Sequence, residues 1–400
     1  MCGIVFLSTN KKLNKSKIDG LLKLMKNRGP DSQNHLEFKY NRRYFYFFHS
    51  RLSIIDLKND SNQPFVKNNL LIIFNGEIYN YLELRKELET YGVKFKTNSD
   101  TEVLLEAYRF WGNNFTSKLV GMWSLVLYDI LDKKIFISRD PANEKPLFFS
   151  YLKKDNFVYA SEIKYIYHLD KKIKKKFNYR KICSDLVDGY RGWFINNQTF
   201  NQKIINVDSF FNYEYLNIDK KKYIFKKILV KKNYRKLIIN QNYNTIKKKL
   251  RKLLIDSVDI SLRSDVPLAY SLSGGIDSNL ITSISKKILN NKISTYSIID
   301  KDPRYNESDI ITKVCRDNNY DSNYINISKF NHFDELRNLT KYYSYPVPTI
   351  NFLIQSYLVK KLKKNDIKVL ISGNGGDEVF TGYYHHYLIY FKNKIHQNYK

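Results

Sequence analysis

Short apolar runs alternate with turn residues through the first 165 residues, and this pattern predicts strands. The runs are rich in β-branched and aromatic residues, as strands usually are. Two further stretches, 17–26 and 80–91, carry apolar residues at helical spacing and predict helices. The mixture predicts an α+β domain in which helices cover the sheets. Strands are expected at 4–7, 43–48, 70–74, 122–129 and 134–138.

The pattern changes near residue 243, where helical and strand-like segments begin to alternate. An apolar stripe from Ile246 to Val258 predicts the first of these helices. Alternating units of this length predict a doubly wound α/β domain with a parallel sheet. Strands are expected at 267–272, 294–299, 323–327 and 368–372, and further helices at 279–289, 308–317 and 350–361.

Between these two regions, residues 169–244 are rich in lysine and asparagine and lack regular periodicity. We interpret this stretch as the tail of the first domain followed by a connection. The expected organisation is therefore a first domain over 1–205, a connecting segment over 206–243 and a second domain over 244–400.

Composition supports a folded chain of this size. Hydrophobic residues make up 43% of the 400 residues and aromatic residues 15%, well above the level typical of disordered proteins. Three cysteines exclude a disulfide scaffold and favour a reducing compartment. The sequence has no apolar run near the roughly 20 residues that span a bilayer, and its start does not resemble a signal peptide. The expected location is the cytoplasm, without a membrane partner.

The formal net charge of +29, from 68 basic against 39 acidic residues, suggests nucleic acid as a partner. However, lysine far exceeds arginine, and asparagine, isoleucine and tyrosine are also abundant. These four residue types share A/T-rich codons, so base composition alone can produce much of the bias. The lysine clusters at 171–176, 220–222 and 247–249 are interpreted as solvated faces, and no nucleic-acid partner is expected. A basic nucleic-acid-binding protein stays open as an alternative.

Cys2 would become the first residue if Met1 were removed. Its free α-amine could then act as a general base toward its own thiol. Alone, a cysteine at this position is more often a buried small residue. Asn75 and Gly76 could face a developing oxyanion, because an amide and an exposed backbone N–H both donate hydrogen bonds. Arg51 offers a fork for a carboxylate, while Glu77 and Asp100 offer negative charge for an α-ammonium group.

Five motifs then occur in the order found in class II glutamine amidotransferases, and the residues within them resemble those of the asparagine synthetase branch. They are Cys2-Gly3-Ile4, Arg28-Gly29-Pro30-Asp31-Ser32, Arg51-Leu52-Ser53-Ile54-Ile55-Asp56, Asn75-Gly76-Glu77-Ile78-Tyr79-Asn80 and Ser99-Asp100-Thr101-Glu102-Val103. The resemblance covers residues 1–165 and implies an N-terminal nucleophile hydrolase domain, an αββα sandwich. It implies that Cys2 attacks the side-chain amide of glutamine, with Asn75 and Gly76 as the oxyanion hole. The glutamine-binding residues implied are Arg51, Leu52, Ser53, Ile54, Ile55, Asn75, Gly76, Glu77 and Asp100.

One turn departs from the family pattern. The segment 139–147 has Asn143 where relatives usually have glycine. Asparagine tolerates the left-handed backbone region better than most residues with a side chain, so the turn is expected to survive.

A second candidate site is the loop Ser271-Leu272-Ser273-Gly274-Gly275-Ile276-Asp277-Ser278, which lies between a predicted strand and a helix. Glycines allow backbone N–H groups to approach an anion, and the following helix adds its positive end. Asp277 could hold Mg²⁺. A plain strand-to-helix turn with an aspartate cap is the alternative. The loop is not a Walker A sequence.

This loop resembles the SGGxDS motif of ATP pyrophosphatases, and Ser372-Gly373-Asn374-Gly375-Gly376-Asp377-Glu378 resembles the second glycine-rich loop of asparagine synthetases. The resemblance implies an α/β ATP-pyrophosphatase domain with ATP as co-substrate and Mg²⁺ held by Asp277 and Asp377. It places Asn374, Asp377 and Glu378 on the side of aspartate and its adenylate. The residues implied for ATP and pyrophosphate are Leu272, Ser273, Gly274, Gly275, Asp277, Ser278, Ile298, Ser372 and Gly373.

Three departures limit this second resemblance. Asn374 stands where well-studied relatives carry glutamate, and asparagine can neither carry charge nor act as a base. The family's Pro-Gly turn is absent around 206–215. The chain also ends at Lys400, whereas relatives continue through further helices. We therefore expect a complete glutaminase half and a compromised synthetase half.

The sequence thus predicts a glutamine-hydrolysing asparagine synthetase that uses glutamine, aspartate and ATP, with a homodimer as a possible assembly. A related amidotransferase acting on another carboxylate, such as a sugar acid, stays open because of Asn374. A pseudoenzyme with a regulatory binding role is a further alternative.

Overall fold

The computed structural model describes residues 1–153, 155–189, 197–209, 211–216, 224–229 and 242–398. The chain divides into two compact units. Unit 1 comprises residues 1–239 and 333–350, and unit 2 comprises 240–332 and 351–400. No helix among the described residues is long and apolar enough to cross a membrane.

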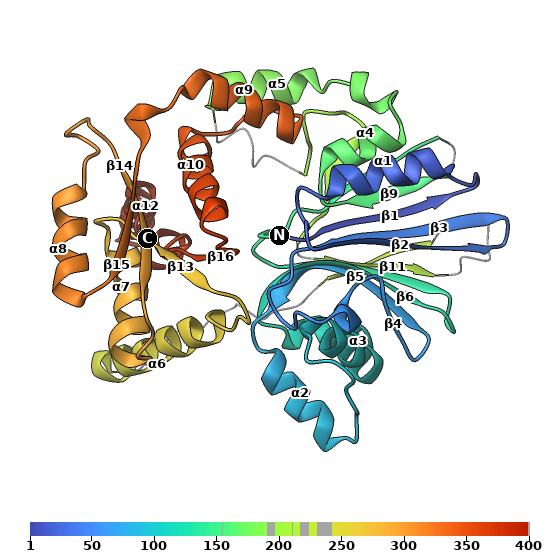
Figure 1. The fold of residues 1–400 in the computed structure, drawn as a ribbon, viewed down its shortest axis with the longest axis horizontal. Helices are drawn as coiled ribbons and strands as arrows, with labels where there is room; N and C mark the ends of the chain where they lie inside the picture. Colours follow the sequence, from blue (N-terminus) through green and yellow to red (C-terminus); the bar gives the residue numbers. More distant parts are fainter. Residues whose placement is uncertain (154, 190–196, 210, 217–223, 230–241, 399–400) are drawn as a thin grey trace. The chain divides into compact units, whose positions relative to one another are not determined.

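Unit 1 is built on two six-stranded antiparallel sheets (Figure 1). The first has the order β10 (Ile204–Asn206), β8 (Phe148–Tyr151), β9 (Phe157–Ala160), β1 (Gly3–Thr9), β3 (Arg43–Arg51) and β2 (Ser32–Tyr40). The second has the order β12 (Ile224–Leu229), β11 (Phe211–Leu216), β7 (Lys134–Arg139), β6 (Gly121–Asp129), β5 (Leu70–Ile78) and β4 (Phe65–Lys67).

Among the described residues of unit 1, three apolar cores fill the spaces between its layers. Alternate residues of a strand point to opposite faces, so β1 contributes Ile4 and Phe6 to the core between the sheets. Val5 and Leu7 instead pack beneath α1 (Lys15–Met25) and α4 (Ile163–Leu169). The second sheet buries its outer face against α2 (Tyr81–Thr90) and α3 (Asp100–Trp111). The αββα sandwich expected from the resemblance is confirmed.

The first unit is larger than the expected domain over 1–205. Strand β11 pairs with β7, and β12 pairs with β11, so part of the expected connecting segment over 206–243 continues the second sheet. The segment 333–350, which contains most of α9 (His332–Tyr343), also belongs to unit 1. There Tyr345 packs against the core beneath α1 and α4. These contacts were not apparent from the lysine-rich and tyrosine-rich sequences involved.

Unit 2 contains a parallel sheet with the order β15 (Asp321–Asn326), β14 (Ser294–Ile299), β13 (Leu268–Ser271) and β16 (Val369–Ile371). Its core is formed by residues such as Tyr270, Leu272 and Ile311. The expected doubly wound α/β fold is confirmed. The helices are α6 (Tyr243–Ser261), α7 (Ile276–Ser283), α8 (Ser308–Asn318), α10 (Ile350–Lys364), α11 (Gly376–Phe380) and α12 (Tyr384–Asn398), and a π-helical turn at Ile284–Ile288 follows α7.

Candidate active site

A small cavity in unit 1 gathers the side chains of the first predicted site. Cys2 lies immediately before β1, while Asn75, Gly76 and Glu77 lie on β5, which belongs to the other sheet. Asp100 begins α3. Of the predicted residues, Cys2, Arg51, Leu52, Ile54, Ile55, Asn75, Gly76, Glu77 and Asp100 line the cavity. Ser53 does not line it, and its backbone N–H donates to Asp31 Oδ2 at 2.7 Å.

The Cys2 thiol is held by the backbone of Leu52. Its Sγ accepts from the Leu52 N–H at 3.4 Å and lies 3.7 Å from the Leu52 carbonyl oxygen. Burial raises the pKa of the thiol. The Cys2 carbonyl accepts a hydrogen bond of 2.7 Å from Arg28 Nε, and Arg28 forms an ion pair of 3.2 Å with Glu162. The start of the chain is therefore fixed at both its backbone and its nucleophilic atom.

Asn75 and Gly76 form a closely packed wall of the cavity. Asn75 is fully buried, and its Nδ2 donates to Ser124 Oγ at 3.4 Å. Its Oδ1 has no hydrogen-bond partner among the described residues. A Cβ atom at Gly76 would clash with the carbonyl oxygen of Met122 and the ring of Phe74, so only glycine fits here.

Arg51 is the buried last residue of β3, and its side chain holds the loop that follows the strand. Its two terminal nitrogens donate to the carbonyl oxygens of Lys58, Ile55 and Asp56. A further bond of 2.9 Å reaches Asn62 Oδ1. Among the described residues, the Nε–H has no such acceptor. The guanidinium therefore presents its charge and one N–H to a ligand, rather than the free two-pronged fork that the sequence suggested.

Two buried carboxylates complete the wall of this cavity. Burial raises the pKa of Glu77 to about 7 and the pKa of Asp100 to about 6. Asp100 Oδ2 accepts from the Ile78 N–H at 3.1 Å, which couples α3 to β5. Ser99 caps α3 through a bond of 3.2 Å from the Glu102 N–H. Glu77 is thus near its protonation midpoint at neutral pH, whereas Asp100 is mostly ionised.

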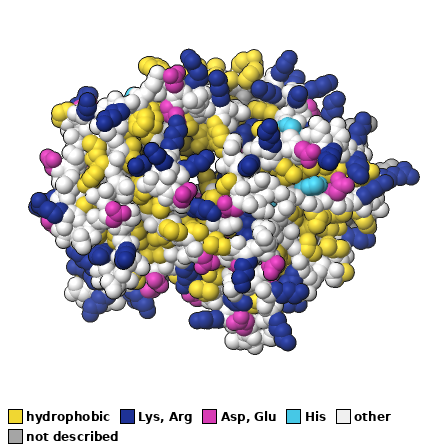
Figure 2. All heavy atoms as spheres, in the orientation of Figure 1, with side chains coloured by type: hydrophobic (Ala, Val, Ile, Leu, Met, Phe, Trp, Pro, Cys, Tyr) yellow, Lys and Arg dark blue, Asp and Glu magenta, His cyan; other side chains and the backbone are white. Residues whose placement is uncertain are grey.

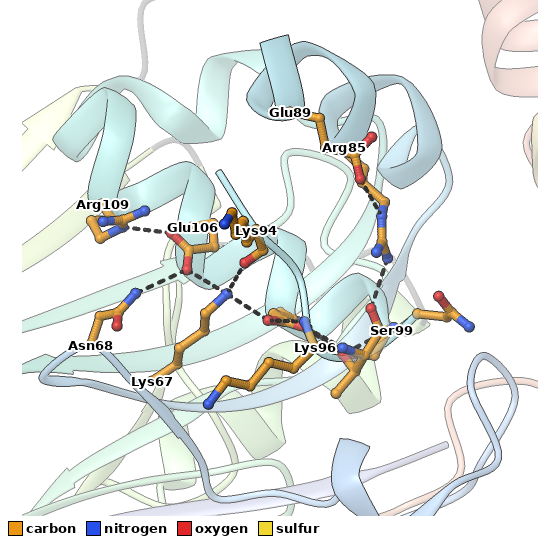
Figure 3. A network of polar contacts seen from close by, with 12 residues as sticks. Lys67, Asn68, Arg85, Glu89, Lys94, Lys96, Ser99, Glu106 and Arg109 are labelled. Atoms are coloured by element: carbon orange, nitrogen blue, oxygen red, sulfur yellow. Dashed lines mark hydrogen bonds and ion pairs between the residues drawn. The ribbon is translucent and has the colours of Figure 1, made fainter. Parts of the chain in front are cut away.

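A buried network of ion pairs holds α3 through its residues Glu102 and Glu106 (Figure 3). Lys67 Nζ lies 2.6 Å from Glu102 and 2.8 Å from Glu106, and both glutamate side chains are fully buried. Glu102 also accepts from Thr97 Oγ1 at 2.7 Å and from the backbone N–H groups of Lys96 and Thr97. The network therefore fixes the turn that precedes Asp100.

Sequence reasoning missed several residues of this cavity, among them Gln63, Phe74, Thr101 and Lys145. Lys145 follows the turn whose Asn143 departs from the family pattern. That turn survives as expected, because Asn143 adopts a left-handed φ of 60°. The lysine is part of the same motif, but its place in the same cavity as Cys2 depends on the packing of the two sheets against each other.

The second predicted site lies where the strand order of unit 2 reverses. Strands β14 and β15 lie on one side of β13, and β16 lies on the other. Loops that follow the carboxyl ends of β13 and β16 form a pocket of about 970 Å³ at this switch point, as is usual for open α/β sheets. Predicted residues that line it are Ser273, Gly275, Asp277, Ser278, Ser372, Gly373, Asn374, Asp377 and Glu378.

The two loops of this pocket touch at Asp277. A Cβ atom at Gly373 would lie 2.8 Å from the Ser278 nitrogen and 2.9 Å from the Asp277 Cβ, and one at Gly376 would clash with the Asp277 carboxylate. Ser273 Oγ and Ser278 Oγ are 3.0 Å apart. The loop amide of Gly274 donates to Glu307 Oε2 at 2.9 Å, so a carboxylate already contacts a backbone donor expected to face phosphate.

Three residues predicted for the ATP site do not line the pocket: Leu272, Gly274 and Ile298. Leu272 is 2% exposed and packs in the core of the unit. Residues that the sequence did not indicate, including Leu250 and Leu254 of α6, line the pocket instead. The apolar spacing of these two residues predicts a helix face but does not indicate that the face lines a pocket.

The lysine clusters agree with solvated faces where they are described. In the cluster at 171–176 every lysine is exposed and only Ile173 is buried, and the three lysines at 247–249 are exposed on α6. The cluster at 220–222 lies outside the described residues. Figure 2 shows basic side chains scattered over the visible face and interspersed with acidic ones, not gathered into one patch.

Comparisons with known proteins match both parts of the chain. The family model described as glutamine amidotransferase domain matches residues 1–227, and the model described as asparagine synthase matches residues 249–398. The chain is similar to the putative asparagine synthetase [glutamine-hydrolyzing] 2 of Methanocaldococcus jannaschii, with 31% identity over 96% of this chain and 76% of the relative.

Two bacterial relatives are similarly distant. Asparagine synthetase [glutamine-hydrolyzing] 1 of Bacillus subtilis is 32% identical over 89% of this chain and 54% of its own length. Asparagine synthetase B [glutamine-hydrolyzing] of Escherichia coli is 29% identical over 94% of this chain and 63% of its own length. The chain therefore spans less than two thirds of either bacterial relative.

Proposed function

This chain belongs to the family of glutamine-hydrolysing asparagine synthetases, and on that premise we propose that it makes asparagine in two half-reactions. Unit 1 hydrolyses glutamine to glutamate and ammonia. Unit 2 joins aspartate to AMP from ATP, with release of pyrophosphate, and ammonia then displaces AMP. The observation that carries the proposal is the unit 1 cavity, which surrounds Cys2 with an amide, a glycine, an arginine and two carboxylates.

Removal of Met1 is the step that would make Cys2 active. With Met1 in its wall, the cavity has a volume of about 50 Å³, which holds a few water molecules and not an amino acid. Removing Met1 would enlarge the cavity and expose the α-amine of Cys2. Burial lowers the pKa of the present amino terminus to about 5, so a buried amine here is neutral and can accept a proton.

The chemistry then follows from the groups around Cys2. The α-amine takes the thiol proton, and Sγ attacks the side-chain amide carbon of glutamine. The proton passes to the leaving nitrogen, ammonia departs, and water hydrolyses the thioester that remains. A half-turn of the Asn75 carboxamide places Nδ2 where Oδ1 now lacks a partner, and Nδ2 can then donate to the oxyanion together with the Gly76 N–H.

The remaining groups of the cavity suit the α-groups of glutamine. Arg51 supplies positive charge and its Nε–H to the α-carboxylate. Glu77 and Asp100, as carboxylates, attract the α-ammonium group. Groups of both charges in the wall of one small cavity would orient a zwitterionic amino acid, with its side chain toward Cys2.

The pocket of unit 2 suits ATP with Mg²⁺. Mg²⁺ is usually bound by one or two carboxylates together with phosphate oxygens, and Asp277 and Asp377 line the same pocket. When bound, the ion would neutralise charge on the departing pyrophosphate. Ile276 and Asp277 at the start of α7 line the pocket, and the N–H groups of this helix end would hold phosphate. The loop N–H groups of Ser273, Gly274 and Gly275 donate to protein side chains here and would have to exchange these acceptors for phosphate. Asn374 and Glu378 line the same pocket and would contact the aspartate.

Two assays on the full chain test the proposal. Ammonia release from glutamine should occur, should fall at least about 10³-fold in Cys2→Ala, and should be unchanged in Cys183→Ala, which alters an exposed free cysteine. Pyrophosphate release from ATP should depend on aspartate and should persist in Cys2→Ala supplied with ammonia. Equal ammonia release from wild type and Cys2→Ala would overturn the glutaminase assignment. Pyrophosphate release with another carboxylate but not with aspartate would overturn the choice of acceptor.

A further inference from the structure

Lys145 is held at the glutaminase cavity by an unusually rigid turn. Its backbone N–H donates to Asp140 Oδ2 at 2.9 Å, and its carbonyl oxygen accepts from Arg139 Nε at 2.7 Å. Asp140 is itself buried and fixed to β6, because its N–H donates to the Trp123 carbonyl at 2.8 Å. The backbone at Lys145 is therefore anchored on both sides to the sheet that carries Asn75 and Glu77.

The side chain of Lys145 is buried without a close partner. It is 7% exposed and lines the same cavity as Cys2 and Glu77. Among the described residues, its Nζ forms no hydrogen bond and no ion pair within 4 Å. A buried ammonium group is unfavourable unless charge nearby compensates it. Charged and titratable groups that act on it are Glu77, Arg28, Glu144 and Cys2, together with the amino terminus of Met1.

Glu77 lacks support of its own, in contrast to Asp100. The Asp100 carboxylate accepts from the backbone N–H groups of Ile78 and Thr101 and is also stabilised by Arg51. Among the described residues, the Glu77 carboxylate has no hydrogen-bond donor. Lys145 is the strongest influence that favours its charged form, whereas burial and the neighbouring Asp100 oppose that form. The positive charge of Lys145, and less strongly that of the amino terminus, therefore favours the ionised form of Glu77.

We propose that Lys145 is a positioning residue of the glutaminase site, whose ammonium group stabilises the Glu77 carboxylate that receives the α-ammonium of glutamine. The inference rests on the proposed glutaminase function and adds a residue to it. Lys145 acts through Glu77 and not on the scissile amide. It belongs to glutamine binding, so its loss should raise KM for glutamine and leave kcat largely unchanged.

The test compares Lys145→Met with wild type in glutamine hydrolysis, using the full chain after removal of Met1. At about pH 7, KM for glutamine should rise roughly fivefold in Lys145→Met, because a rise of about one unit in a pKa near 7 lowers the ionised fraction of Glu77 from about a half to about a tenth. The difference should shrink toward about pH 8.5, where Glu77 ionises without help. Lys145→Arg, which keeps the charge, should recover most of the loss. Lys181→Met is the matched control, because Lys181 is also buried but does not line the cavity, and its KM should equal that of wild type.

A second arm separates electrostatics from packing. In a Glu77→Gln background, Lys145→Met should raise KM no further, because the carboxylate that it stabilises is already gone. A KM increase that is equal at all pH values, or that adds fully to the effect of Glu77→Gln, would overturn the inference. An unchanged KM would also overturn it. Absence of glutamine hydrolysis in wild type would instead overturn the proposed function, so the two failures are distinguishable.

Discussion

Unit 1 surrounds its nucleophile with polar groups that solvent hardly reaches, whereas unit 2 places its carboxylates in the first turns of α7 and α11, where Asp377 and Glu378 contact solvent. Asn75 is 0% exposed, Asp100 6% and Glu77 8%. In unit 2, Asp377 and Glu378 are exposed, although they line the pocket at the switch point. The two candidate sites thus differ in burial more than in the kinds of residue that they use.

This difference in burial indicates how the charged groups of each site are prepared to bind substrate. In a buried cavity charges interact strongly, and donors are fixed before the substrate arrives. The charged groups of such a site need partners that offset the cost of their burial, and unit 1 provides these partners through ion networks and backbone hydrogen bonds. An open pocket keeps its carboxylates hydrated, so the nucleotide and its cation would complete it. Substitutions in buried networks should therefore alter folding, and substitutions in the loops of unit 2 should alter activity.

The largest expected effect concerns the buried network behind α3. Lys67→Met removes the cation shared by Glu102 and Glu106 (Figure 3). Glu106 then keeps its ion pair with Arg109, whereas Glu102 keeps only hydrogen bonds from neutral groups such as Thr97 among the described residues. Breaking a buried ion network in this way costs about 3–5 kcal/mol of unfolding free energy. Urea denaturation followed by tryptophan fluorescence measures it, since Trp111 and Trp123 both lie in unit 1.

The matched control for this substitution is Arg304→Met in unit 2. Arg304 forms an ion pair of 2.6 Å with Asp302, but its side chain is 78% exposed. Exposed ion pairs contribute little because water screens them. We expect no measurable change in its denaturation curve. A Lys67→Met protein as stable as Arg304→Met would contradict the importance that we assign to the buried network.

The next effect should appear in catalysis by unit 2. In Gly373→Ala, the added methyl would press against the Ser278 nitrogen and the Asp277 Cβ at 2.8–2.9 Å. The loop that carries Asp277 must then shift, and misplacing a binding group by about 1 Å can reduce a rate about 10²-fold. Pyrophosphate release should fall by that order. Ammonia release from glutamine should be unchanged, and equal losses in both assays would show that the effect is not local.

A helix or strand could be predicted from the sequence where its pattern of apolar and polar residues matches the burial of its faces. Strand β1 is apolar on both faces because one face packs between the sheets and the other beneath helices, so its run was recognisable. Helix α3 was missed because it is buried nearly all around, and its buried Glu102 and Glu106 look like exposed charges in the sequence. Strand β2 was missed because most of its residues are only partly buried.

The candidate site could be predicted where a local motif carries the chemistry. Asn75, Gly76 and Glu77 are adjacent, so one motif indicated all three. Arg51 was identified too, but its bonds to loop carbonyls follow from the folded loop and not from its neighbours in sequence. Lys145 reaches Cys2 only through the pairing of distant strands. Sequence patterns thus indicated the reactive groups. The burial of these groups and the partners that balance their charges could be seen only in the three-dimensional structure.

A smaller effect should appear in the pH dependence of glutamine binding. Glu77 and Asp100, with pKa values near 7 and 6, bind the α-ammonium only when ionised. As pH falls through these values both become protonated, so KM for glutamine should rise, by about tenfold or more between about pH 8 and about pH 6. In Asp100→Asn the remaining rise should follow Glu77 alone. A flat KM over this range would show that the two carboxylates are ionised throughout.

The smallest effect concerns two exposed asparagines in left-handed backbone, one in each unit. Asn143 has a φ of 60° and precedes Lys145, and Asn319 has a φ of 52° at the end of α8. Alanine at either position should cost about 1 kcal/mol of unfolding free energy, and glycine should be close to neutral, because glycine adopts positive φ freely. Asn143→Ala should also raise KM for glutamine slightly, because the Asn143 carbonyl accepts from Arg139, which anchors Lys145. Asn319→Ala should not. Equal KM values in the two alanine variants would mean that the turn tolerates strain without moving Lys145.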